Sequence, residues 1–151
     1  RRFVPVCEFY IGYKQTLLQV REYIANIRIP IKSMNDFHRF YKVSKRLEDD
    51  ISSVMGAFRF ETFGNEISLA RVAFGGMAAT PVRAMKIEKN LIGQTITDDL
   101  IKKVESLILE ELEPISDVRA SSSYRLEIAQ AMLRRALQEL SGQERLLISE
   151  L

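Results

Sequence analysis

The chain has 151 residues, of which 46% are hydrophobic and 28% are charged, and this size and composition suit one globular domain with its own core. Lys and Arg number 22 and Asp and Glu number 20, so the net charge of +2 excludes the strongly basic surface typical of proteins that bind nucleic acids or anionic membranes. The single cysteine and single histidine exclude an internal disulfide and a metal site built from several such residues.

The cysteine, Cys7, lies among Val4, Val6 and Phe9. Because no neighbouring residue would activate its thiol, we expect a small buried hydrophobe rather than a nucleophile. No run approaches the roughly 18 apolar residues of a membrane span, and the lack of paired cysteines favours a cytoplasmic protein. The chain opens at Arg1 without an initiator methionine or signal-peptide pattern, so we expect a piece of a longer protein.

The first thirty residues predict one helix and one strand. Apolar residues recur at helical spacing from Val6 to Gln15 and predict a short helix there. From Glu22 to Pro30, apolar residues alternate with polar ones such as Asn26 and Arg28, as a half-buried strand requires. Pro30 would end that strand.

The middle of the chain predicts a hairpin and a further extended segment. Arg39 to Ser44 is expected to be extended, and apolar residues alternate from Val54 to Phe60. Gly64 and Asn65 supply a turn before a β-rich run from Ile67 to Phe74. The following Gly75-Gly76 matches no phosphate-binding pattern and is interpreted as the end of a strand.

The second half of the chain predicts three helices. Thr80 and Pro81 give a cap and a first helical residue, and Thr97 before two acidic residues gives another start. Gly93, Pro114 and Gly142 mark the ends. The predicted helices cover residues 81–90, 98–112 and 124–140.

Strands come first and helices last, without a repeating βα unit. This order predicts an α+β fold in which an antiparallel β-sheet packs against a bundle of about three helices. Residues 143–151 show no packing pattern of their own and could form a tail that docks on another chain.

The densest charge pattern runs from Tyr41 to Ile51, where six of the eleven residues are charged, with the bases before the acids: Lys42, Lys45, Arg46, Glu48, Asp49 and Asp50. Such a run is usually a solvated surface, but basic side chains beside an apolar run could also hold an anionic or polar cofactor. Adjacent carboxylates alternate faces in a strand, and His38 has no recognisable partner pattern. We therefore expect no catalysis by the isolated chain.

Several segments together resemble the flavoprotein C-terminal domain of the molybdenum hydroxylases, and within that family the xanthine dehydrogenase branch. Their order and spacing carry the resemblance, which covers nearly the whole chain. The segments are Gly12 to Leu18, Glu22 to Pro30, Tyr41 to Ile51, Ala73 to Ala84, and Asp117 to Ser121 running into Tyr124-Arg125.

The resemblance implies part of an FAD-bearing subunit. Residues 1–30 would be the tail end of the FAD-binding domain, 31–142 the flavoprotein C-terminal domain, and 143–151 a C-terminal tail. The implied partners are an upstream FAD-binding domain and a molybdenum-cofactor-binding subunit, with the molybdenum cofactor and 2Fe-2S clusters outside this chain. Electrons from purine oxidation would reach NAD through FAD, and neither nucleic acid nor membrane is an expected partner.

Carried onto this sequence, the resemblance implies flavin contacts at Ile24 and Lys42. Ile24 would offer backbone hydrogen bonds and an apolar edge to the isoalloxazine ring, and Lys42 would stabilise the negative charge that develops when the ring is reduced. Glu22, Arg46 and Asp49 would adjust the electrostatics around the flavin and the approach of the nicotinamide. No catalytic residue or metal ligand is expected on this chain.

Two functions stay open. The first is an oxidoreductase fragment that completes one wall of an FAD site. Alone, such a fragment should bind FAD weakly or not at all. The alternative is a structural or subunit-interaction domain without a direct flavin role, for which the predicted helix 124–140 and the tail are suited.

Overall fold

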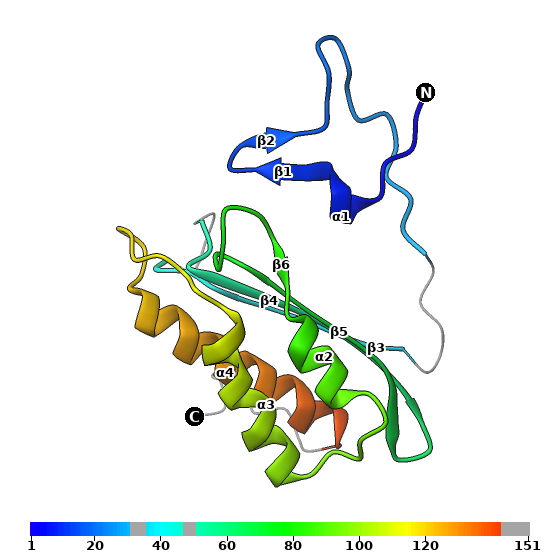
Figure 1. The fold of residues 1–151 in the computed structure, drawn as a ribbon, viewed down its shortest axis with the longest axis vertical. Helices are drawn as coiled ribbons and strands as arrows, with labels where there is room; N and C mark the ends of the chain where they lie inside the picture. Colours follow the sequence, from blue (N-terminus) through cyan, green and yellow to red (C-terminus); the bar gives the residue numbers. More distant parts are fainter. Residues whose placement is uncertain (31–35, 47–50, 143–151) are drawn as a thin grey trace.

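The computed structural model describes residues 1–30, 36–46 and 51–142. From residue 36 onward, a four-stranded sheet packs against three helices (Figure 1), which confirms the predicted α+β class. The strands are β3 (Asp36–Val43), β4 (Val54–Phe63), β5 (Glu66–Gly75) and β6 (Val82–Arg83), and the helices are α2 (Met85–Leu91), α3 (Asp98–Glu111) and α4 (Ser122–Leu140).

The strands lie in the order β3-β4-β5-β6, and each neighbouring pair is antiparallel. Phe58, in the middle of β4, lies between Arg39 of β3 and Val72 of β5. The predicted turn between β4 and β5 is confirmed: Gly64 has a φ of +61°, a conformation that glycine adopts without steric cost. The interpretation of Gly75 as the end of a strand is also confirmed.

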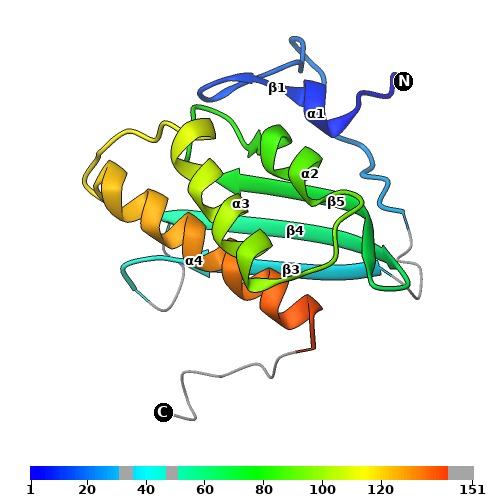
Figure 2. The ribbon, with the colours of Figure 1, turned by 60° about the horizontal axis from the view of Figure 1, so that its bottom comes forward.

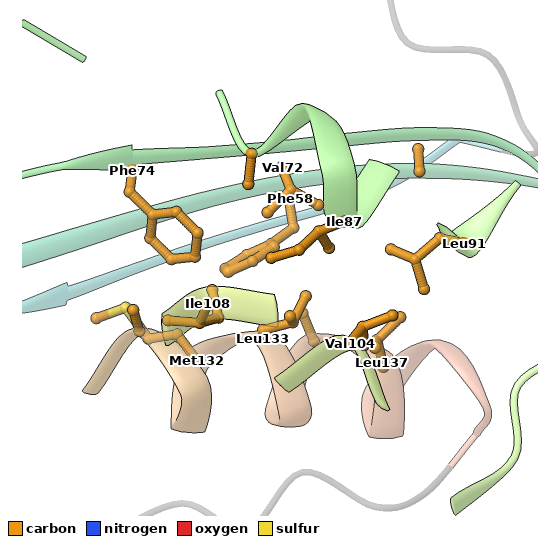
Figure 3. Close-up of a cluster of buried hydrophobic side chains, with 14 of the residues drawn as sticks. Phe58, Val72, Phe74, Ile87, Leu91, Val104, Ile108, Met132, Leu133 and Leu137 are labelled. Carbon is orange, nitrogen blue, oxygen red and sulfur yellow. The ribbon is translucent and has the colours of Figure 1, made fainter. Parts of the chain in front are cut away.

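The core lies between one face of the sheet and the helices. Alternate residues of β4 and β5 point toward α3 and α4, which lie side by side across that face (Figure 2). Burying each large apolar side chain stabilises the fold by about 1.5–3 kcal/mol. The buried side chains that meet there include Phe58, Phe74, Ile87, Val104, Ile108, Leu133 and Leu137 (Figure 3).

Two helices begin at side-chain caps. The Thr97 hydroxyl accepts a hydrogen bond from the Leu100 amide and confirms the predicted start of α3. The Ser121 hydroxyl accepts one from the Tyr124 amide, so α4 begins two residues before the predicted start at Tyr124. Each cap satisfies one of the amides that a helix leaves unpaired at its first turn.

The start of α2 is not where Thr80 and Pro81 predicted it. Residues 82 and 83 pair with β5 as strand β6, and the helix begins only after Ala84. The cap comes from another helix, because the Glu111 carboxylate of α3 accepts hydrogen bonds from the Lys86 and Ile87 amides. Thr80 and Pro81 precede the short edge strand β6, but a capping residue followed by proline is also the local pattern of a helix start. The sequence alone therefore did not distinguish the two.

Residues 1–30 depart from both predicted elements. The helix expected from Val6 to Gln15 is wrong beyond Phe9, because the chain turns through Lys14, at a φ of +55°, and pairs with itself. The strand expected over 22–30 is also wrong: no regular element forms there, since no described strand lies alongside. The elements that form are α1 (Val6–Phe9), β1 (Tyr10–Gly12) and β2 (Gln15–Thr16).

Cys7 is exposed, so the prediction of a buried cysteine is wrong. The reason is that α1 has only four residues and buries none of them. Segment 1–30 lies on the side of the sheet opposite α3 and α4 (Figure 1). No helix in the described ranges has the length and hydrophobicity to cross a membrane.

Candidate functional site

The described part of the charged run continues from strand β3, and its first lysine faces away from the core. Tyr41 and Val43 pack against the core, so the intervening Lys42 points to the open face of the sheet. Met55 lies opposite Lys42 on β4, and Gly75 lies opposite Met55 on β5. The Lys42 side chain is exposed and makes no hydrogen bond or ion pair with another described residue. Its ammonium group is therefore available to a ligand on this face.

The surface beside Lys42 is apolar. The neighbouring row of the open face runs from Phe40 through Ala57 to Ala73. Phe40 is 63% exposed and Met55 is 41% exposed, and their neighbours Ala57, Ala73 and Gly75 are small. We define the open face by Phe40, Lys42, Met55, Ala57, Ala73 and Gly75.

Further along the open face the charged residues are paired. Arg59 donates a hydrogen bond of 2.7 Å to the buried Asp36 and another to Glu61, and the Arg59 guanidinium holds the pKa of Asp36 below its usual value. His38 is half-buried, with Nε2 3.3 Å from the Asp36 carboxylate. Lys42 therefore differs from Arg59, which has two carboxylate partners.

The strand beneath Lys42 is fastened to the end of α4. The buried Glu139 carboxylate accepts hydrogen bonds from Arg39 and Arg135. Burial alone would raise the pKa of Glu139, but these two hydrogen bonds lower it. Burial of the Tyr41 hydroxyl, with the Glu139 charge nearby, raises the pKa of Tyr41 to about 12. The part of β3 that leads up to Lys42 is thus anchored to α4.

A cleft of about 470 Å³ lies beyond the end of β3. Lys45 reaches across it and donates a hydrogen bond of 2.7 Å to the Val118 carbonyl, while Arg46 is exposed. The lining residues are Val43, Ser44, Lys45, Ser53, Asp117, Val118, Arg119, Ala120, Ser121 and Tyr124. Asp49 lies outside the described residues.

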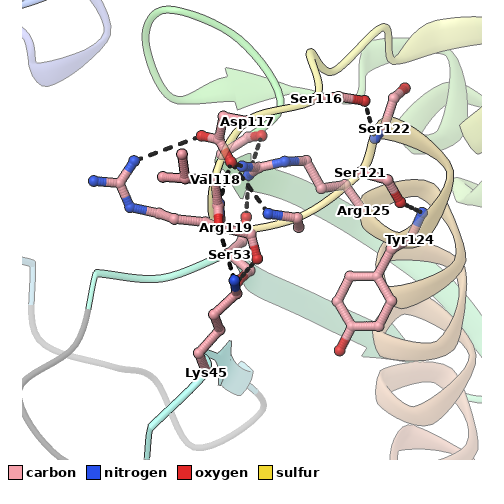
Figure 4. Close-up of polar contacts among 12 residues, drawn as sticks. Lys45, Ser53, Ser116, Asp117, Val118, Arg119, Ser121, Ser122, Tyr124 and Arg125 are labelled. Atoms are coloured by element: carbon pink, nitrogen blue, oxygen red, sulfur yellow. Dashed lines mark hydrogen bonds and ion pairs between the residues drawn. The ribbon is translucent and has the colours of Figure 1, made fainter.

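A buried arginine contacts two of the residues that line this cleft, Ser53 and Asp117 (Figure 4). Arg125 is 3% exposed and donates hydrogen bonds to the Ser53 carbonyl, to the Gly76 carbonyl at 3.0 Å and to Asp117 Oδ1 at 2.7 Å. Asp117 Oδ1 also accepts the Arg119 amide at 2.8 Å. The amide hydrogen bond from Arg119, then that from Ala120 and the Arg125 contact, lower the pKa of Asp117 to about 2.

The two candidates in the first thirty residues are placed differently. The Glu22 carboxylate accepts hydrogen bonds from Arg2 and from the Gln19 amide, and the Arg2 guanidinium lowers the pKa of Glu22. Ile24 is 53% exposed. Both belong to segment 1–30, which is drawn apart from the sheet (Figure 1). Among the five predicted residues, Lys42 lies on β3 and Arg46 follows the end of that strand, whereas Glu22 and Ile24 lie in segment 1–30.

Sequence reasoning missed the roles of Ser53, Gly76 and Arg125. A signal for Arg125 was present, because it lies four residues before Ala129 on the apolar stripe of α4, where a charged residue needs a buried partner. Nothing in the sequence identified Ser53 or the Gly76 carbonyl as that partner. Within the described ranges, no group of three or more His, Cys, Asp or Glu side chains could hold a metal ion.

Residues 39–140 match the family described as the CO dehydrogenase flavoprotein C-terminal domain. The chain belongs to this family. The match confirms the resemblance at the level of the molybdenum hydroxylase flavoproteins and covers the whole sheet-and-helix unit except its first residues. The charged residues Lys42, Lys45 and Arg46 fall inside it.

The relatives of this domain carry several different substrate names. The glyceraldehyde dehydrogenase medium chain of Sulfolobus acidocaldarius is 32% identical over 93% of this chain and 49% of its own length. The xanthine dehydrogenase FAD-binding subunit of Escherichia coli O157:H7 is 26% identical over 91% of this chain and 48% of its own length. The likeness therefore establishes the flavoprotein family and leaves the xanthine branch as a proposal.

A solved structure has the same fold. Carbon monoxide dehydrogenase from Hydrogenophaga pseudoflava, in a form lacking the Mo-pyranopterin moiety of the molybdenum cofactor, superposes with a TM-score of 0.85 at 26% identity. The match covers 95% of this chain and 50% of that chain. This chain thus spans about half the length of each of these three relatives.

Proposed function

We propose that this chain forms one wall of the FAD site in the flavoprotein subunit of a molybdenum hydroxylase. The observation that carries the proposal is the exposed ammonium group of Lys42, which has no partner among the described residues and lies beside Met55 and Gly75 on the open face. An isoalloxazine ring is flat and largely apolar and has a polar edge, so an apolar surface with one cation at its margin fits it. When bound, FAD supplies the hydride and electron transfer chemistry.

The residues of this chain would position the flavin ring and place charges beside it. Lys42 would bind the polar edge of the ring and stabilise the negative charge that reduction places there. The hydrogen bonds around Glu139 hold β3 in place, so that little reorganisation is needed at Lys42. Ile24 would contribute an apolar contact, and Arg46 and Asp49 would adjust the local electrostatics. Glu22 fits this role less well, because Arg2 already occupies its carboxylate.

The partners follow from the surfaces that remain open. Segment 1–30 would be the tail end of an upstream FAD-binding domain, which would cover both its apolar side chains and the open face of the sheet. A molybdenum-cofactor-binding subunit and 2Fe-2S clusters would lie elsewhere in the complex. The weak or absent FAD binding expected of the chain alone follows from the contacts that the upstream domain would supply.

The experiment replaces Lys42 with Ala in the complete flavoprotein, with Lys102→Ala on the exposed side of α3 as a matched control. We expect Lys42→Ala to lower the flavin midpoint potential and flavin retention, because a cation is lost from the site of the developing charge, and Lys102→Ala to change neither. Equal flavin content, potential and acceptor reduction in the two variants would contradict the proposal.

We further propose that the acceptor is NAD and the substrate a purine such as xanthine, which the likeness to the Escherichia coli subunit supports. Following NADH formation with xanthine, glyceraldehyde and carbon monoxide in turn tests both points. Xanthine-dependent NADH formation is the expected result. Turnover with only one of the other two substrates would contradict the purine assignment.

The alternative is a structural or subunit-interaction domain without a direct flavin contact. Its support is the exposure of large apolar side chains across segment 1–30, including Phe3, Val20, Tyr23, Ile27 and Ile29. Such side chains mark a surface that another chain or domain covers. This function predicts that substitutions in segment 1–30 weaken assembly while Lys42→Ala leaves the flavin unaffected.

A further inference from the structure

The connection between β3 and β4 is held at both of its described ends. At its base, the Ser53 amide donates a hydrogen bond of 2.8 Å to the Val43 carbonyl. On the outgoing side, Lys45 Nζ donates one of 2.7 Å to the Val118 carbonyl. Lys42 immediately precedes this base, so its backbone position depends on the groups that fix Val43, Lys45 and Ser53.

Arg125 joins the three chain segments that meet at this base. Its Nη1 donates to the carbonyls of Ser53, before β4, and Gly76, after β5. Its Nη2 donates to Asp117, in the connection between α3 and α4. The guanidinium group is planar and presents several donors in a fixed arrangement, which a lysine cannot reproduce. A single buried side chain thereby sets the distance between three loops.

Asp117 connects Arg125 to Lys45 through the turn that follows it. The Asp117 amide donates to the Ala120 carbonyl at 3.0 Å, and its carboxylate accepts from the Arg119 and Ala120 amides. This turn fixes the direction of the Val118 carbonyl, which is the group that accepts from Lys45. The contacts run without a break from Arg125 through Asp117 and Val118 to Lys45 (Figure 4).

The site requires glycine at position 76. Gly76 has a φ of +82°, and a Cβ there would lie 2.5 Å from the Ser53 carbonyl oxygen and 2.9 Å from Arg125 Nη1. Any side chain would therefore push apart the two groups that Arg125 brings together. This close approach indicates a built contact rather than an incidental one.

We propose that Arg125 and Asp117 are positioning residues that hold Val43, Lys45 and Ser53, and through them Lys42, in the geometry that the flavin needs. The proposal rests on the flavin role of Lys42 given above. Arg125 is buried and does not itself reach the open face, so its influence passes through the backbone. Asp117 and Arg125 would thus support the flavin site without touching the flavin.

The first test follows backbone amide exchange in the chain with Arg125→Met, with Arg125→Lys as the conservative variant and Arg134→Met as the control. Arg134 is another arginine of α4, paired with Glu105 of α3. We expect Arg125→Met to speed exchange at the Ser53 amide at least tenfold and to leave the Ile67 amide, bonded to the Gln94 carbonyl, unchanged. Equal acceleration at both amides would mean general destabilisation and would overturn the positioning role.

The second test measures the flavin midpoint potential and the flavin dissociation rate in the complete flavoprotein. Arg125→Met should lower the potential and speed dissociation several-fold, Arg125→Lys should do so less, and Arg134→Met should do neither. Asp117→Asn keeps an oxygen that can accept from Arg125, so it is a milder variant for use if Arg125→Met does not fold. We expect it, too, to speed exchange at the Ser53 amide and to lower the flavin potential.

The outcomes separate the two proposals. A flavin that responds to Lys42→Ala but not to the Arg125 and Asp117 variants would overturn the positioning role and leave the flavin contact standing. A flavin that is insensitive to Lys42→Ala would overturn the flavin contact. A looser Ser53 amide with an unchanged flavin in the Arg125 variants would also overturn the positioning role.

Discussion

Segment 1–30 and the sheet-and-helix unit that follows it are both rich in apolar residues, but the sheet-and-helix unit buries these side chains and segment 1–30 leaves them exposed. From residue 54 onward, large side chains such as Phe58, Phe74 and Leu133 are buried. In segment 1–30 no residue is buried, and Val20 and Tyr23 are more than 80% exposed. The apolar content of a segment therefore does not decide its burial, because a second layer must be present to cover it.

The ion pairs show the same contrast. In the sheet-and-helix unit, Glu139, Asp36 and Glu88 are buried carboxylates, each paired with at least one arginine. In segment 1–30 the pair between Arg2 and Glu22 lies at the surface, where water and salt screen the two charges and such pairs contribute little to stability. The sheet-and-helix unit is stabilised by its own buried contacts. Segment 1–30 needs contacts with another domain or chain to cover its apolar side chains.

Truncating a core aromatic residue should give the largest effect and sharpen this contrast. Phe58 is 1% exposed, and its ring lies 5.7 Å from that of Phe74 and 5.8 Å from that of Tyr41. Phe58→Ala should lower the free energy of unfolding by about 3–5 kcal/mol, whereas Tyr23→Ala should change it by less than about 0.5 kcal/mol. Urea unfolding of the two variants decides this. A comparable loss for Tyr23→Ala would break the contrast.

Two glycines with similar backbone angles should differ in their tolerance of a side chain. Gly76→Ala meets the Ser53 carbonyl and Arg125, whereas a Cβ at Gly64 meets nothing within 4 Å. Gly64→Ala should cost about 1 kcal/mol for its left-handed backbone alone, and Gly76→Ala should cost at least about 2 kcal/mol because overpacking adds to it. The measurement is the shift in urea midpoint, and equal shifts would contradict the crowding at position 76.

Acid should weaken the Asp117 contacts in a defined range. The pKa of Asp117 is about 2 in the folded chain against a usual 3.8, so its contribution to stability is complete above about pH 4 and is lost as the pH falls toward 2. The difference in unfolding midpoint between the wild type and Asp117→Asn should therefore be larger at pH 5 than at pH 2.5. Asp36 and Glu139 are present in both proteins, so their own titration largely cancels. The same difference at both pH values would refute this account.

The smallest effect is expected at alkaline pH. Because the pKa of Tyr41 is raised to about 12, the folded state favours its neutral form, and that contribution is lost as the pH rises from about 10 through 12. A tyrosinate absorbance titration should show one late ionisation, which Tyr41→Phe removes and Tyr23→Phe leaves in place. Persistence of the late ionisation in Tyr41→Phe would show that another tyrosine causes it.

Local sequence patterns predicted the sheet-and-helix unit well. Its helices and strands have apolar residues at regular spacing, and turn or cap residues mark where they end or begin. The Gly64 turn and the Thr97 cap each coincide with a change in apolar spacing, and the structure has both where they were predicted. The alternation over 22–30 looked equally clear, but among the described residues no strand lies beside it to pair with. At Pro81, pairing of the next residues with β5 overrode a good helix start.

The candidate site could be predicted only in part. Lys42 was identified through the family resemblance, and its orientation to the open face follows from strand alternation. The contacts of Arg125 with Ser53 and Gly76 join residues 72 and 49 positions apart in the sequence. Spacing along the chain carries no information on such contacts, so only the folded structure reveals them.

The most direct test of the flavin-wall account is hydrogen exchange in the chain alone and in the complete, FAD-loaded flavoprotein. If the chain forms one wall of the flavin site, peptides from segment 1–30 and from the strand that carries Phe40 and Lys42 should gain protection in the flavoprotein, while the exposed face of α3 should not change. Unchanged exchange in both segment 1–30 and β3 would contradict the account, since nothing would then cover the surfaces assigned to FAD and its binding domain.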